Sequence, residues 1–170
     1  PRNLDEARQE VLRQTTYAQL QATGDAGVDA LASALRDREL DHRLNAALAL
    51  QMLAMGIAMP DGDAFVSTPI GRALPALIHA LDDPASRMRS YSAQAIFQIG
   101  PTAAPAVPAL IRLLESGDVG ERMAACTALV GIGPRARAAL PALRRAAKDP
   151  NRDVSQAATR ALERVQRFSP

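Results

Sequence analysis

Cysteine, histidine and the large aromatic residues are scarce in this chain. Its 170 residues include one cysteine, two histidines, three phenylalanines, two tyrosines and no tryptophan. Because a disulfide or a cysteine–histidine zinc site needs several such residues, the sequence predicts neither. No apolar run approaches the length of a membrane span, and the opening PRNLDEARQE lacks the apolar region of a signal peptide. We therefore expect a soluble chain, with the cytoplasm favoured as its compartment.

Motifs for catalysis are also missing. The sequence contains no glycine-rich phosphate loop and no nucleotide-binding fingerprint. It offers no convergent set of nucleophile, base and metal ligand. We predict a chain that is not an enzyme and that holds no cofactor and no metal.

What the chain does have is one segment written several times. LPALIHALDDPASRMRSYSAQAIFQIGP (74–101) returns 33 residues later as VPALIRLLESGDVGERMAACTALVGIGP (107–134), and again, degraded, over 140–165. A divergent first copy, 28–53, aligns at an offset of 46 residues, so 13 extra residues separate it from the second. A fixed period of this size predicts a stacked array of one supersecondary unit.

Each copy predicts two helices and a turn. In the second copy Leu74, Leu77, Ile78 and Leu81 form one helical stripe, and Met88, Ser92, Ala95, Ile96 and Ile99 form another. Asp82-Asp83-Pro84 predicts the turn between them, and Ser86 is the expected cap of the second helix. The glycine–proline pairs 100–101 and 133–134 predict where second helices end.

The whole chain therefore reads as one all-α domain, an α-solenoid of antiparallel helix pairs. We expect a capping helix over 4–23, repeats over 28–55, 74–100, 107–133 and 140–165, an inserted segment over 56–73, and a tail over 166–170.

The pattern resembles the HEAT-repeat superfamily, and in particular the bacterial type known as phycobilisome-lyase HEAT-like repeats. The PALI openings carry the resemblance, together with Met88-Arg89, Ser92 to Ile96 and Ile99-Gly100, which recur as Arg122, Ala125-Cys126, Ala128-Leu129 and Ile132-Gly133. The resemblance implies a right-handed solenoid whose second helices line the concave side. It also implies that Arg43, Arg89 and Arg122 face the turn aspartates of neighbouring repeats. Two departures are the missing glycine–proline stop in the first copy and Ser155 in place of the arginine in the last.

If second helices line a groove, their outward positions predict its surface. Several of these residues are large and apolar, which is typical of a binding surface. The alternative is that curvature buries them between repeats. By repeat, the positions are Leu44, Leu48 and Gln51; Ser90, Gln94 and Phe97, with Tyr91 beside them; Met123, Thr127 and Val130; and Gln156, Arg160 and Glu163.

Two other regions are candidate binding surfaces. The inserted segment contains Met55, Ile57, Met59, Phe65 and Val66, which either contact a partner or fill a wedge between repeats. Residues 134–170 hold nine basic and three acidic side chains, whereas residues 1–133 hold 11 and 15. This basic end either attracts an acidic partner or solvates the last repeat.

We expect the histidines and the cysteine to have structural roles and not chemical ones. His79 aligns with polar residues and is expected to face solvent, whereas His42 is expected to be partly packed. Cys126 aligns with Ala47, Ala93 and Thr159, which predicts a buried packing position.

The leading hypothesis is a non-catalytic scaffold that presents its groove to a helix or extended segment of another protein. The resemblance implies an alternative, an accessory role in attaching or removing bilin chromophores, although the buried-type Cys126 argues against it. Nucleic-acid binding through the basic last repeat is a further alternative, which is disfavoured because the predicted groove holds one arginine and no aromatic residues interleaved with basic ones beyond Phe97. End-to-end self-association of the array is also open.

Overall fold

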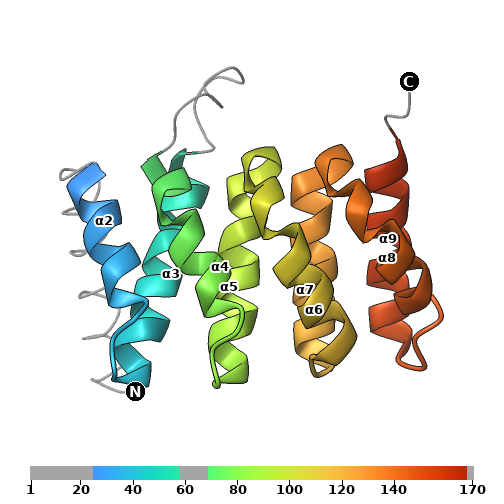
Figure 1. Ribbon diagram of the computed structural model, residues 1–170, viewed down its shortest axis with the longest axis horizontal. Helices are drawn as coiled ribbons and strands as arrows, with labels where there is room; N and C mark the ends of the chain where they lie inside the picture. Colours follow the sequence, from blue (N-terminus) through green and yellow to red (C-terminus); the bar gives the residue numbers. More distant parts are fainter. Residues whose placement is uncertain (1–24, 58–68, 168–170) are drawn as a thin grey trace, which may run out of the picture.

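The protein is an α-solenoid of paired helices. The computed structural model describes residues 25–57 and 69–167, and no strand occurs within those ranges. The pairs stand side by side in one row from α2 to α9 (Figure 1). Their bounds are α2 Asp25–Ala34 with α3 Leu40–Ile57, α4 Leu74–Ala80 with α5 Ser86–Ile99, α6 Val107–Ser116 with α7 Val119–Ile132, and α8 Leu140–Ala146 with α9 Arg152–Gln166.

The curvature of the row follows from how the pairs stack. Each second helix (α3, α5, α7, α9) packs along its length against the next one, whereas the first helices α4, α6 and α8 meet over fewer residues. Helices that pack along their length stand about 8–10 Å apart. The closer stacking of second helices places them on the shorter, concave side of the array.

The predicted helical stripes form the core. Met88, Ser92 and Ile96 are fully buried on α5, and Leu77 is fully buried on α4. Ser92 is the polar member of this stripe, and its hydroxyl donates to the carbonyl of Met88 at 2.8 Å, so burial leaves no unpaired donor. Burying a leucine side chain contributes about 1.5–3 kcal/mol, which makes these stripes the main stabilising feature of each repeat.

The second helices α5 and α7 end at glycine, as the sequence predicts. Gly100 and Gly133 have φ angles of 71° and 63°, a region that side chains with a β-carbon rarely adopt. Each glycine begins a short 3-10 helix, η2 Gly100–Ala106 or η3 Gly133–Ala139, that leads to the next first helix. The proline of each PAL motif lies in the first turn of that helix, where its missing N–H costs nothing.

The cap of α5 differs from the expectation. Ser86 is the first residue of the helix and Ala85 is its N-cap, without a side-chain cap bond. In the next repeats the equivalent N-caps are Asp118, in a full capping box with Glu121, and Asn151. The Ser86 hydroxyl instead donates to Asp118 Oδ2 at 2.7 Å, so it links two repeats.

The segment between the first two repeats also differs from its predicted bounds. Helix α3 continues to Ile57, with Gly56 inside its last turn. Residues 69–73 form η1 Pro69–Ala73, the counterpart of η2 and η3, and so belong to the regular connection between repeats. The rest of the predicted insertion, the predicted capping helix 4–23 and most of the tail lie outside the described residues.

Candidate partner-binding groove

A ladder of arginines at the turn edge fixes the second helices in register. Arg43 Nε lies 2.9 Å from Asp83 Oδ2, and Arg122 Nε donates to Asp149 Oδ2 at 2.9 Å. The same guanidinium groups donate to carbonyls of their own turns, as Arg122 does to Gly117 at 2.8 Å. Hydrogen bonds to charged groups contribute about 1.5–3 kcal/mol each. The ladder that the family resemblance implies is therefore present, and it holds each turn to the next repeat.

One rung of this ladder is built differently. The turn position held by Asp83 and Asp149 is Ser116 in the third repeat, and Arg89 Nε donates at 2.8 Å to Glu121 Oε1 instead. Glu121 is only 1% exposed, and its other oxygen accepts the N–H of Asp118 at 2.7 Å.

Gly117 makes room for this buried carboxylate. A β-carbon at residue 117 would lie 2.7 Å from Cβ of Glu121 and 2.5 Å from the carbonyl oxygen of Leu113. The equivalent residues in the neighbouring repeats are Pro84 and Pro150, so proline has given way to glycine where the carboxylate is buried.

Two aspartates of the turn edge are held ionised by their neighbours. The N–H of Asn151 and the Arg122 guanidinium lower the pKa of Asp149 below its ordinary value. The Ser86 hydroxyl and the N–H of Glu121 lower the pKa of Asp118. Both carboxylates therefore stay charged near neutral pH and keep the turns fixed.

A second set of ion pairs joins the first helices, and the sequence reading did not anticipate it. Arg112 donates to Asp82 Oδ2 at 2.8 Å, and Arg145 pairs with Glu115 one repeat later. In the sequence, an acidic residue and a basic residue 30 positions apart recur in successive repeats, and this pattern could have predicted the pairs. These exposed pairs contribute about 0–1 kcal/mol each, so they guide the stacking more than they stabilise it.

On the concave side, none of the predicted groove residues is buried. The apolar members Leu44, Leu48, Phe97 and Val130 are partly exposed, and Met123 is 36% exposed. Curvature therefore does not close the groove over these side chains. The remaining positions divide into partly exposed residues, Gln51, Ser90, Tyr91 and Gln94, and exposed residues, Thr127, Gln156, Arg160 and Glu163.

The apolar surface extends further than the sequence reading placed it. The exposed large hydrophobic residues of the described chain are Leu40, Val119 and Met123, at 37%, 38% and 36%. Leu40 precedes Leu44 by one helical turn on α3, and Val119 precedes Met123 on α7. Continuing the same helical stripe by one turn toward the N-terminus would have found both residues.

Helix α5 interrupts this apolar surface. Ser90 and Gln94 occupy its outward positions, and Gln51 of α3 donates to the Gln94 side chain at 3.3 Å. Phe97 lies against Gly131 of α7, where an added β-carbon would stand 2.8 Å from Cδ2 of the ring. Phe97 is thus a packing residue between two repeats as well as part of the groove surface.

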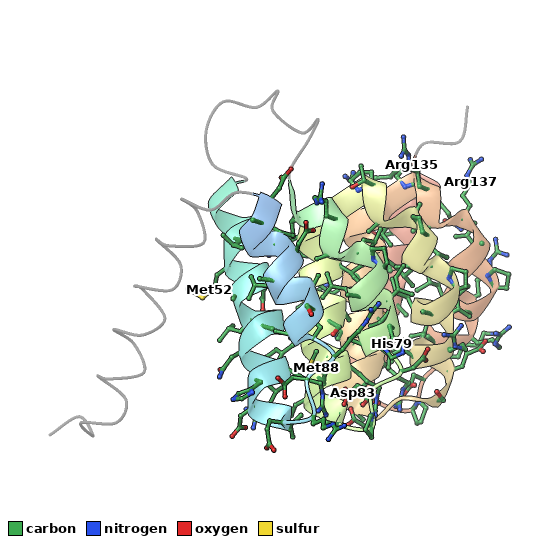
Figure 2. The ribbon with its side chains drawn as sticks, turned by 60° about the vertical axis from the view of Figure 1, so that its left-hand side comes forward. Met52, His79, Asp83, Met88, Arg135 and Arg137 are labelled. Carbon is green, nitrogen blue, oxygen red and sulfur yellow. The ribbon has the colours of Figure 1, made fainter. Side chains whose placement is uncertain are left out.

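Helix α9 supplies the charged end of the groove. Arg152 and Arg160 are exposed on it, two turns apart, and Glu163 follows one turn later. Further basic side chains surround this repeat, and Arg135 and Arg137 project outward from η3 at the edge opposite Asp83 (Figure 2).

The residues considered for chemistry take structural positions. Cys126 is fully buried, as predicted, and burial raises the pKa of its thiol to about 12. His79 is exposed on α4, as predicted. The expectation for His42 is wrong, because its side chain is 64% exposed and its Nδ1 turns to Asp37 at 3.4 Å. Within residues 25–57 and 69–167, no group of three or more His, Cys, Asp and Glu side chains could hold a metal ion.

A shallow pocket of about 240 Å³ lies at the turn edge between the second and third repeats. It is lined by the paired charges of Asp82 with Arg112 and of Arg89 with Glu121. These charges already pair with one another, so the pocket is a hollow between two ion pairs that join the repeats. Among the helices that the structure describes, none combines the length and apolarity needed to cross a membrane.

Solved structures with the same fold include an engineered protein, 25% identical, with a TM-score of 0.68 over 84% of this chain. The CpcE–CpcF complex of phycocyanin lyase from Nostoc sp. PCC7120 is 26% identical, with a TM-score of 0.68 over 94% of this chain. This chain covers 63% and 60% of those two chains.

A designed armadillo repeat protein in complex with the peptide (KR)4 is 20% identical, with a TM-score of 0.67 over 96% of this chain and 79% of its own. No curated protein matches the sequence. The family of HEAT repeats matches residues 74–163, more than half of the chain. Together with the stacked helix pairs and the arginine ladder, this match shows that the protein belongs to the HEAT-repeat family.

Proposed function

We propose that the protein is a non-catalytic scaffold that binds a segment of another protein in the groove along α3, α5, α7 and α9. The observation that carries the proposal is the exposure of Leu40, Val119 and Met123 on the second helices. When a partner covers apolar side chains that are exposed on a concave face, their burial stabilises the complex by about 25 cal/mol per Å².

The rigidity of the array supports the same role. The ladder from Arg43 to Asp149 holds the second helices in fixed register, so the groove need not order itself when a partner binds. The designed armadillo repeat protein, which shares the fold, is in complex with a peptide.

The proposal can be tested with peptides selected on the purified chain from a random displayed library. A selected peptide is then titrated against the native chain and against Met123→Glu, which places a charge at the centre of the groove. We expect its affinity to fall by about tenfold or more, because the apolar contact is replaced by a desolvated carboxylate. Circular dichroism should show an unchanged helical spectrum.

The matched control is His79→Glu, the same substitution at another exposed residue, on the first helix α4. It should leave the affinity unchanged. Equal binding of the peptide to the native chain and to both variants would place the site outside the groove, and failure to enrich any peptide would argue against a peptide-binding role.

The similarity to phycocyanin lyase favours a second candidate, an accessory role in handling bilin chromophores. The buried Cys126, whose thiol pKa is about 12, does not fit a covalent role in such chemistry. Mixing the chain with a free bilin tests the idea directly. A shifted and intensified absorbance band would support it, and an unchanged spectrum would argue against it.

A further inference from the structure

The concave face carries a pattern that specifies the kind of segment it would bind. The N-terminal turns of the four second helices align in register, so they form rows that cross the groove from repeat to repeat. The first row is Leu40, Ser86, Val119 and Arg152, and the next is Leu44, Ser90, Met123 and Gln156. Each row reads apolar, polar, apolar and then polar, with a positive charge at the end of the first row.

Three of the four apolar positions in these rows are exposed, and the fourth, Leu44, is partly exposed. Leu40 is 37% exposed on α3, and Val119 is 38% exposed on α7. Between them, Ser90 and Gln94 give α5 hydroxyl and amide groups, and Gln94 bonds to Gln51. At the level of these two rows, an occupant therefore meets two apolar sites separated by polar groups of α5, while Phe97 lies nearer the other end of that helix.

The spacing of the helices favours an extended occupant. Two steps between packed helices amount to about 16–20 Å, which an extended chain covers in about six residues. Side chains six positions apart in an extended chain point to the same side, so both can reach the groove. A partner helix lying along the second helices, between α3 and α7, would instead rest its apolar face on Ser90 and Gln94.

The positive charge at the α9 end of the groove favours one orientation of the bound segment. Arg152 and Arg160 on α9 are exposed, and neither makes an ion pair with a described residue. Residues 134–170 hold nine basic against three acidic side chains. Helix α9 itself carries three arginines, Arg152, Arg160 and Arg164, against two acidic residues, Asp153 and Glu163, so an excess of positive charge remains on it. Acidic residues of a partner would be attracted to this end of the groove.

Resting on the function proposed above, we propose that the groove binds an extended, acidic segment of another protein. Two apolar anchors about six residues apart occupy the sites on α3 and α7, and acidic residues two to four positions beyond the second anchor face Arg152 and Arg160. The anchors provide affinity, and the arginines choose the orientation and reject basic segments.

The test uses three fluorescent peptides of about twelve residues. The first has leucines at positions 1 and 7 and aspartates at 9 and 10, among serine and alanine. The second has the same composition with the leucines at 1 and 4, the spacing along one face of a helix. The third has lysines in place of the aspartates. Fluorescence anisotropy at low salt measures the affinity of each for the native chain.

We expect the first peptide to bind about tenfold tighter than the second and about fivefold tighter than the third. The double variant Val119→Ser, Met123→Ser should remove the preference for the first peptide over the second. The double variant Arg152→Glu, Arg160→Glu should reverse the preference for aspartate over lysine.

Four results would overturn the inference. Equal affinity for the first two peptides would contradict the proposed spacing of the anchors. Tighter binding of the second peptide would indicate that the occupant is a helix and not an extended segment. Binding of the lysine peptide as tightly as the aspartate peptide would remove the acidic requirement. Binding of none of the three would reject the inference, while the Met123→Glu comparison with a selected peptide judges the groove itself separately.

Discussion

Phe97 of α5 lies directly on the backbone of α7 at Gly131. A β-carbon at residue 131 would stand 2.5 Å from the carbonyl oxygen of Phe97 and 2.8 Å from its ring. Such distances are well inside van der Waals contact, so the second and third repeats approach closely because residue 131 is glycine. The contact fixes the spacing of the two helices that form the centre of the groove.

Gly131→Ala should therefore destabilise the protein. Alanine gains up to about 1 kcal/mol of helix propensity, but the forced separation of α5 and α7 costs about 1–3 kcal/mol. The clash involves backbone atoms, which cannot rotate away, so we expect a net decrease in the free energy of unfolding. Urea denaturation followed by circular dichroism measures it. Gly71→Ala, where nothing lies within 4 Å of the added carbon, is the control and should be close to neutral. Equal stability of the two variants would contradict the close approach.

The buried rung of the ladder gives a prediction with a rescue. Glu121→Met introduces the residue found at the equivalent position 88, but it leaves Arg89 without its carboxylate. Breaking a buried pair costs about 3–5 kcal/mol; since Arg89 is 25% exposed, we expect about 2–3 kcal/mol.

Adding Ser116→Asp to Glu121→Met should restore most of this loss. The double variant recreates the rung seen at Asp83 and Asp149, with the carboxylate on the turn. Denaturant midpoints of the single and double variants provide the comparison. No recovery in the double variant would mean that Glu121 acts through its cap of α7 and not through Arg89.

Acid should weaken the turn edge. The pKa of Asp149 is lowered in the folded protein, so this carboxylate stabilises the fold above about pH 4, the ordinary value of an aspartate. The contribution is lost as the pH falls below that value and the group protonates. Urea midpoints at pH 7 and pH 3 should therefore differ less in Asp149→Asn than in the native chain. An unchanged difference would show that Asp149 does not contribute.

Cys126 should be unreactive until the protein unfolds. Its thiol is fully buried on α7, and burial raises its pKa to about 12, so almost no thiolate forms at pH 8. A thiol reagent should label the native chain far more slowly than the chain in guanidinium chloride. Rapid labelling of the native chain would reveal local opening of α7.

The sequence was most informative where a residue repeats. The period of 33 residues predicted the helix pairs, the glycine stops at 100 and 133 and the buried position of Cys126, because each copy must bury the same stripe against its neighbour. Residues 69–73 were misassigned because they align with the later connections only once the extra residues are placed before them.

Departures from the repeat were harder to predict. The burial of Glu121 depends on Gly117, which leaves room for its side chain, and on Arg89, which pairs with it where the turn has Ser116, and no single position shows that combination. His42 pairs with Asp37 and is exposed, although the equivalent residues of the other repeats are buried, so a local contact decides its position. Leu40 and Val119 lie at helix starts, where the length of the apolar stripe depends on how far the neighbouring turn covers it.

The position of a bound segment on the protein is the most direct test of the groove. Isotope-labelled chain titrated with a selected peptide reports, through amide chemical shifts, which helices the peptide touches. We expect the largest shifts in α3, α5 and α7, around Leu44, Ser90 and Met123. Shifts concentrated in α4, α6 and α8, with the second helices unchanged, would contradict it.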